Sequence, residues 1–172
     1  MLNCINLSRQ RNPCLCGNYP DMGKCTCTYP QIQNYLGKIS QPFLDRIDIC
    51  VETPKIKYEE LIGKEDTYTT EEMRQKVEAA RVLQSERFTE NKFSTNSQMG
   101  KEELKEYCKL SSNCEKLMKQ AYEVFHLTAR SYFKILKVAR TIADLERHEE
   151  ICEEDLKEAI GYRMIDKKYW GN

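Results

Sequence analysis

The chain has 172 residues, with 27 Lys plus Arg against 27 Asp plus Glu and 40% hydrophobic residues. The apolar content is enough to bury a core, so wholesale disorder is not expected, and the balanced charge provides no overall attraction to nucleic acid or anionic lipid. No run of about 18 apolar residues is present, which excludes a transmembrane helix, and residues 1–10 lack a signal peptide's apolar stretch and cleavage site. We therefore expect a cytoplasmic protein with no membrane partner.

The residue pattern divides the chain into two parts, 1–65 and 66–172. The first part is mixed: turn-forming residues come first, helical spacing of apolar residues follows over 31–39, and alternation over 46–51 predicts a strand. One strand cannot form a sheet, so its neighbours are missing from this pattern. The second part is helical and predicts a small bundle that buries its apolar stripes internally.

Capping signals mark the helices of the second part. Thr69 and Glu72 form a capping-box pattern before a helix running to about Phe88, and Thr128 can cap the longest helix. In that first helix, Met73, Val77 and Ala80 mark one apolar face. Further helices are predicted at 102–108, after a capping pair at Ser112 and Glu115, and around 156–160.

Nine cysteines are many for a reducing compartment, and four of them are Cys14, Cys16, Cys25 and Cys27. An odd total without a secretion signal favours free thiols or metal ligation over disulfides. Four thiolates with a turn-rich spacer can close tetrahedrally on zinc, although each pair here is separated by one residue and zinc sites usually have about two to four. The alternative is four reduced thiols in a loop, so these cysteines are candidate zinc ligands only.

Two arginines are further candidate functional residues. Arg46 lies at the start of the alternating segment, and Arg130 lies in the first turn of the longest predicted helix. A cation at a helix N-terminus opposes the macrodipole unless an anion docks there. From the residues alone, pairing of Arg46 with Asp45 or Asp48 and solvation of Arg130 remain the simpler explanations.

The sequence contains no G-x-x-x-x-G-K-[ST] phosphate loop and no apolar strand that ends in paired acids to hold magnesium. Neither His126 nor His148 has a serine or cysteine at a readable triad spacing, so both are taken as surface or packing residues. This chain alone is therefore not expected to hydrolyse a nucleoside triphosphate.

Short strings along the chain, taken together, carry a resemblance. They are NPCLCG at 12–17, CTC at 25–27, QIQNYL at 31–36, PFLDRIDI at 42–49, LTARSY at 127–132, ILKVARTIADL at 135–145 and EAIGYR at 158–163. From Asn12 onward, almost the whole chain resembles the magnesium-chelatase-like AAA+ ATPases, the YifB/ComM-like family.

The resemblance implies a mainly α fold, in which a C-terminal helical bundle of the AAA+ lid type follows a remnant of the α/β core. It implies that Asn12 is the sensor-one residue that positions the attacking water. Arg46 matches the arginine finger that reaches a neighbouring subunit's nucleotide. Arg130 matches the sensor-two arginine of the helical lid, which reports the state of the nucleotide to that lid.

The implied cofactors are ATP and Mg²⁺, and the implied partners are further AAA+ subunits in a ring, a hexamer by the resemblance. The implied activity is ATP-driven remodelling, with DNA as the substrate by likeness to the ComM group. The family places both Walker motifs before Asn12, and their absence predicts a truncated chain. Two alternatives stay open: a stand-alone zinc-stabilised helical module that binds protein or DNA, and a non-functional remnant.

Overall fold

The computed structural model describes residues 11–53, 58, 69–90 and 93–170. This part of the chain contains helices and no strand, apart from an isolated parallel bridge between Leu110 and Ile151. The helices are α1 (Tyr29–Leu36), α2 (Gln41–Leu44), α4 (Thr70–Arg87), a 3₁₀ turn η1 (Asn96–Gln98), α5 (Lys101–Tyr107), α6 (Ser112–Val124), α7 (Ala129–Leu145) and α8 (Glu153–Trp170). The predicted mainly α fold with a C-terminal helical bundle is confirmed. Among the helices described, none is long and apolar enough to cross a membrane.

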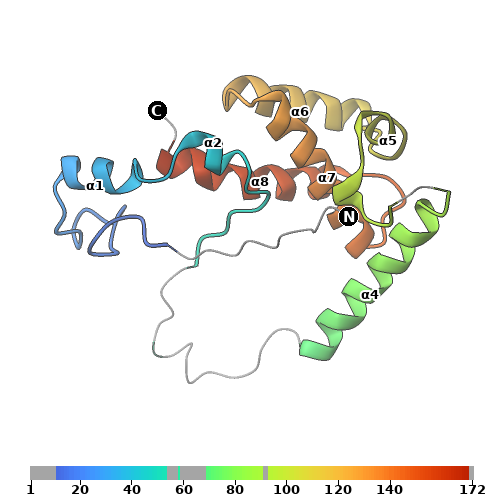
Figure 1. Ribbon diagram of the computed structural model, residues 1–172, viewed down its shortest axis with the longest axis horizontal. Coiled ribbons are helices and arrows are strands. Elements are labelled where there is room, and N and C mark those ends of the chain that lie inside the picture. Colours follow the sequence, from blue (N-terminus) through green and yellow to red (C-terminus); the bar gives the residue numbers. More distant parts are fainter. Residues whose placement is uncertain (1–10, 54–57, 59–68, 91–92, 171–172) are drawn as a thin grey trace.

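The main core lies around α7, which packs along α8 and also contacts α4, η1 and α5, while α6 covers α8 (Figure 1). The apolar stripe of α7 repeats at three and four residues, and it is buried at Ile135, Leu136, Ala139, Ile142 and Ala143 and partly buried at Tyr132. Within the helix predicted around 156–160, which is part of α8, Leu156, Ala159 and Ile160 are buried as well. The principal buried core residues are Phe88, Met99, Leu104, Met118, Leu127, Ile135, Leu136, Ala139, Ala143, Ile151 and Leu156.

The caps of α4 and α7 lie at the predicted residues, and the cap of α6 lies one residue earlier. The Thr69 side chain accepts a hydrogen bond from Glu72 N at 3.2 Å, and Thr69 N donates to Glu72 Oε2 at 2.8 Å, so the predicted capping box is present. Thr128 caps α7 by accepting from Ser131 N. The cap of α6 is Ser111 and not the predicted Ser112, because it is the Ser111 hydroxyl that accepts from Cys114 N.

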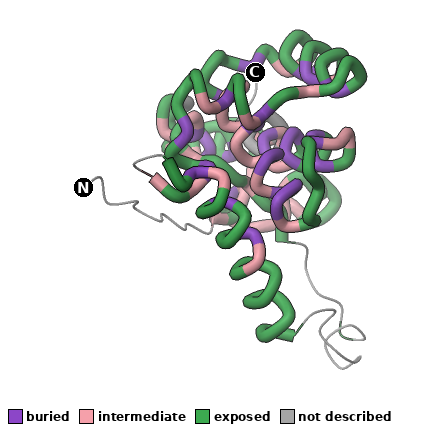
Figure 2. Tube along the Cα trace, turned by 90° about the vertical axis from the view of Figure 1, so that its right-hand side faces the viewer, coloured by how far each residue is buried: buried purple, intermediate pink, exposed green. Residues whose placement is uncertain are grey.

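The N-terminal half of α4 extends beyond the body of the molecule (Figure 2). Ala80 is 3% exposed, but Met73 and Val77 on the predicted apolar face are 52% and 50% exposed. An 18-residue helix is about 27 Å long. The adjoining helices cover only its C-terminal half, so the apolar spacing continues past the point where the core ends.

The predicted strand over 46–51 is wrong. No β-ladder forms there, and Ile49 and Val51 are 51% and 62% exposed. A strand needs a partner backbone to satisfy its N–H and C=O groups. In the part of the chain described, this segment instead lies against α8, where Cys50 N donates to Tyr162 O at 3.1 Å.

A buried carboxylate joins three elements of the bundle. Asp144 of α7 is 1% exposed, and it accepts hydrogen bonds from Arg87 of α4, from Asn96 of η1 at 2.7 Å and from Arg140 at 3.1 Å. Arg140 also donates to the backbone oxygens of His148 and Glu149. A buried charge costs stability unless it is paired and hydrogen-bonded, and this one is both. The network therefore sets the position of α4 on α7.

A second, smaller cluster lies at the other end of α8. Cys14, Ile32 and Leu36 are buried there, so the N-terminal loop packs against α1. The ring of Tyr169 in α8 meets the ring of Tyr19 edge to face, with centroids 6.2 Å apart. Because α8 contributes to both clusters, it connects the cysteine-containing loop with the helical bundle (Figure 1).

Candidate functional site

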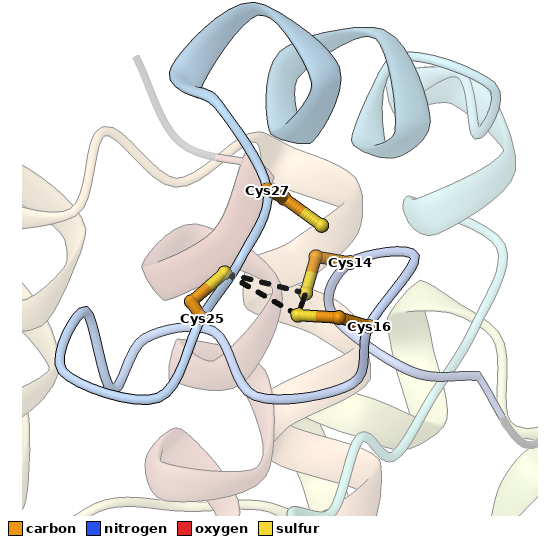
Figure 3. Close-up of side chains that lie close together, drawn as sticks. All are labelled: Cys14, Cys16, Cys25 and Cys27. Atoms are coloured by element: carbon orange, nitrogen blue, oxygen red, sulfur yellow. Dashed lines mark hydrogen bonds between the residues drawn. The ribbon is translucent and has the colours of Figure 1, made fainter.

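The four candidate zinc ligands, hereafter the cysteine quartet (Cys14, Cys16, Cys25 and Cys27), converge in space. Their sulfur atoms all lie within 4.8 Å of one another. The Sγ–Sγ distances are 3.4 Å for Cys14–Cys16, 3.8 Å for Cys14–Cys25 and 3.6 Å for Cys16–Cys25. Figure 3 shows these three sulfurs close together. The sulfur of Cys27, on the loop segment that leads into α1, points toward them.

Two tight turns bring the cysteine pairs together. Gly17 N donates to Cys14 O at 3.2 Å, and Gly17 has a φ of +77°, a conformation that costs a residue with a Cβ about 1 kcal/mol or more. In the spacer, Cys25 N donates to Asp21 O at 2.8 Å. The residues NPCLCG and CTC therefore fold as two turns whose side chains face each other.

Backbone N–H groups make this pocket favourable for negatively charged sulfur. Tyr19 N lies 3.5 Å from Cys14 Sγ and donates to it. The N–H groups of Asn18 and Thr26 act on Cys16 and lower its pKa to about 5. The N–H of Cys27 acts in the same direction on Cys25, but burial and the adjoining Cys16 and Cys14 sulfurs raise the pKa of Cys25 to about 12. Four thiols so close together do not all ionise unless a cation offsets their charge.

Asn12 stands at the edge of this loop. Its side chain packs over Gly17, where an added Cβ atom would lie 3.5 Å from Asn12 Nδ2. The preceding Arg11 donates to Tyr35 O of α1 and places its guanidinium carbon 4.3 Å from the centre of the Tyr35 ring. Asn12 is exposed, yet the chain on both sides of it is held.

Arg46 is exposed and follows α2, where its Nη1 donates to Pro42 O at 2.8 Å. Neither Asp45 nor Asp48 pairs with it: Asp45 accepts from Arg163 of α8 at 3.0 Å, and Asp48 accepts from Lys134 of α7 at 2.7 Å. The aspartates that offered a simple explanation for Arg46 are thus used to attach its segment to the bundle.

Arg130 is exposed in the first turn of α7, and no ion pair to it is seen among the residues described. It precedes Lys134 by four residues and therefore lies about one helical turn away on the same face. Lys134 pairs with Asp48, two residues after Arg46. The Lys134–Asp48 pair thus links the segment that carries Arg46 to α7, the helix that carries Arg130, whereas Asn12 belongs to the cysteine-containing loop.

Arg163 is a residue whose importance the sequence reasoning missed. It is 1% exposed, and its Nη1 donates to Leu44 O at 3.0 Å and to Ile47 O at 2.9 Å. Its Nη2 reaches Asp45 Oδ1. These partners precede it by more than a hundred positions. The signal available in the sequence was that Arg163 lies among apolar residues on one face of its helix.

A second group of potential ligands, His148, Cys152 and Asp155, has a structural explanation. The buried Asp155 accepts from Cys152 N at 2.9 Å, which satisfies the first turn of α8, and it also contacts His148 Nδ1 at 3.1 Å. Cys152 Sγ approaches the same Nδ1 at 3.5 Å, so the histidine does not relay a proton between the other two. We treat this group as the cap of α8.

Comparison with known proteins defines the class. The family described as magnesium chelatase, subunit ChlI C-terminal, matches residues 67–163, which is more than half of the chain, and a second family, magnesium chelatase, subunit ChlI, matches residues 4–61. The chain therefore belongs to the magnesium-chelatase-like family, and the helical bundle is its C-terminal domain.

Curated relatives come from several bacteria. The chain is 36% identical over 156 residues to competence protein ComM of Haemophilus influenzae, an alignment that covers 90% of this chain and 30% of that protein. It is 34% identical over 160 residues to the uncharacterized protein YifB of Escherichia coli, covering 91% of this chain and 30% of YifB. The chain thus spans about 30% of the length of the curated relatives that it matches.

Proposed function

We propose that this chain is the C-terminal part of an AAA+ ATPase of the YifB/ComM-like group and supplies three nucleotide-responsive residues, Asn12, Arg46 and Arg130. The proposal rests on family membership and on the way in which the two arginines are presented. Both residues are exposed; Arg46 lies in a segment that two ion pairs attach to the bundle, and Arg130 lies in α7 of the bundle itself.

The main support for this proposal is that the segment around Arg46 is attached to α7 and α8. Lys134 and Arg163 bind Asp48 and Asp45, so the aspartates beside Arg46 are neutralised and the Arg46 side chain stays available for another anion. A polyphosphate is the anion that suits two such arginines, because a guanidinium binds phosphate oxygens with two parallel N–H groups. The bound ATP would supply this phosphate, and Mg²⁺ would offset its charge.

Each residue has a distinct chemical role in this proposal. Arg46 stabilises the charge that develops on the phosphoryl group held by a neighbouring subunit. Arg130, on the first turn of α7, contacts the nucleotide from the helical bundle and so couples its state to the lid. Asn12 orients the attacking water. The ring of subunits, the hydrolysis of ATP and remodelling of DNA are parts of the proposal drawn from the family resemblance.

The test restores a nucleotide-binding half by fusing the chain to the N-terminal region of an intact homologue. Arg46→Ala should lower turnover by roughly 10³–10⁵ with little change in nucleotide affinity, as for other arginine fingers. Arg74→Ala is the matched control, because Arg74 is an exposed arginine of α4 that pairs only locally with Glu78. It should leave turnover unchanged.

Mixing experiments address the action between subunits. Arg46→Ala subunits mixed with subunits lacking a functional phosphate loop should regain activity, since each supplies what its neighbour lacks. Absence of rescue in assembled mixtures would place Arg46 within its own subunit. If Arg46→Ala does not differ from Arg74→Ala, the motor assignment fails and the stand-alone binding module becomes the better explanation. Stimulation of turnover by DNA tests the substrate separately.

A further inference from the structure

We propose that the cysteine quartet binds one Zn²⁺ as a tetrathiolate site, and that the metal holds the turn against which Asn12 packs. The first statement is independent of the ATPase proposal, whereas the consequence for Asn12 as a sensor rests on it.

The distances between the sulfurs match a tetrahedral site. Zn–S bonds of about 2.3 Å at tetrahedral angles separate the sulfurs by about 3.8 Å. The three measured pairs lie at 3.4, 3.8 and 3.6 Å, and the fourth sulfur is within 4.8 Å of the others. The chain therefore needs only a small adjustment to enclose the ion, despite having one residue between the members of each pair.

Disulfides explain the arrangement less well. A disulfide requires one sulfur pair at about 2.05 Å, with the remaining sulfurs outside the bond. Here all four cysteines are free, and one sulfur, Cys14 Sγ, is in near-equal contact with two others. A common centre satisfies all four groups at once, which pairwise bonding does not.

The surroundings favour a cation of this kind. Cys14 is fully buried against Ile32 and Leu36, and the donors that reach the sulfurs are backbone N–H groups such as Tyr19 N. N–H donors to thiolate sulfur form the outer shell of thiolate metal sites. Four soft thiolates in tetrahedral positions select zinc or iron over Mg²⁺ or Ca²⁺, and zinc has no geometric preference that the irregular spacing would violate.

The consequence for Asn12 follows from the turn. Cys14 and Cys16 lie on either side of Leu15 in the turn that ends at Gly17, and Gly17 supports the Asn12 side chain. Loss of the ion would leave four mutually close thiols with no common centre, and the turn would lose its connection to the 25–27 segment. Zinc thus fixes Asn12 from one side while Arg11 fixes it through Tyr35 from the other.

The experiment measures metal in the purified full chain, prepared with reductant and without a metal-affinity tag. Elemental analysis should find about one zinc per chain. Cys16→Ser and Cys25→Ser should each reduce zinc to below about one tenth of the wild-type content, because thiolates carry the binding. Cys152→Ser is the matched control, since Cys152 is half-buried in the α8 cap, and it should retain full zinc content.

A second readout keeps the proposal testable if a serine variant fails to fold. Wild-type protein stripped of metal and titrated with Co²⁺ should develop the thiolate charge-transfer and ligand-field bands of a tetrahedral tetrathiolate complex, and Zn²⁺ should abolish them. Chelation should also speed tryptic cleavage after Lys24, which is exposed in the spacer between the two pairs. Iron in place of zinc, disulfides in the reduced preparation, or zinc lost with Cys152→Ser but retained in Cys16→Ser would each overturn the proposal.

Discussion

Replacement of Arg163 by methionine tests whether one buried guanidinium attaches the Arg46 segment to the bundle. Methionine keeps most of the unbranched side-chain volume but removes the hydrogen bonds from Arg163 to the backbone oxygens of Leu44 and Ile47 and to the Asp45 carboxylate. The substitution also removes the guanidinium that pairs with the Asp45 carboxylate. Removing one member of a buried pair costs about 3–5 kcal/mol. The Asp45 side chain is 23% exposed and regains some hydration, so we expect the lower end, about 3 kcal/mol.

Urea unfolding followed by circular dichroism measures this loss. With a slope of about 2 kcal/mol per molar urea, a 3 kcal/mol loss lowers the midpoint by roughly 1.5 M. Arg46→Met is the control, because it is the same substitution on the same segment but at an exposed site, and it should change stability by no more than about 0.5 kcal/mol. Amide exchange at Cys50, whose N–H donates to Tyr162 O, should accelerate only in Arg163→Met. Equal midpoints for the two variants would refute the attachment.

Two further changes test the bundle. Leu136→Ala should cost roughly 2–5 kcal/mol in urea unfolding, because Leu136 is 4% exposed at the centre of α7. The control Leu83→Ala, at a 37% exposed site, should cost less than about 1 kcal/mol. Similar losses for the two variants would contradict the assigned core. Burial acts to raise the pKa of Asp155, but hydrogen bonds from Cys152 and His148 hold it below its ordinary value. A carboxyl whose pKa is lower in the folded state adds stability at pH values above its unfolded pKa, and this stability is lost as the pH falls through the folded pKa. Asp155→Asn should therefore flatten the acid side of the stability–pH curve. An unchanged acid slope would argue against a stabilising role for the Asp155 carboxylate.

The helices could be predicted from the sequence because their signals are local. The Thr69–Glu72 box and the Thr128 cap act over three residues, and the stripe of α7 repeats within a single helix. The same reasoning assigned roles to Arg46 and Arg130 only through family resemblance, since the residues themselves allowed simpler explanations. It misplaced the cap of α6 by one residue, because adjacent serines offer the same chemistry and only the backbone direction selects between them.

Tertiary structure decided the features that depend on distant partners. Alternation over 46–51 predicts a strand, but this segment lies against an α-helix and not against a second strand. The alternation therefore does not lead to a β-ladder there. The cysteine pairs were visible in the sequence, yet whether their sulfurs meet depended on two turns and on packing against α1. The clearest case is Arg163, whose charge is useful only because the chain returns after more than a hundred residues to place Leu44, Asp45 and Ile47 around it. The spacing of residues along the chain determines which side chains lie on one face of a helix. The tertiary structure determines which distant residues those side chains contact.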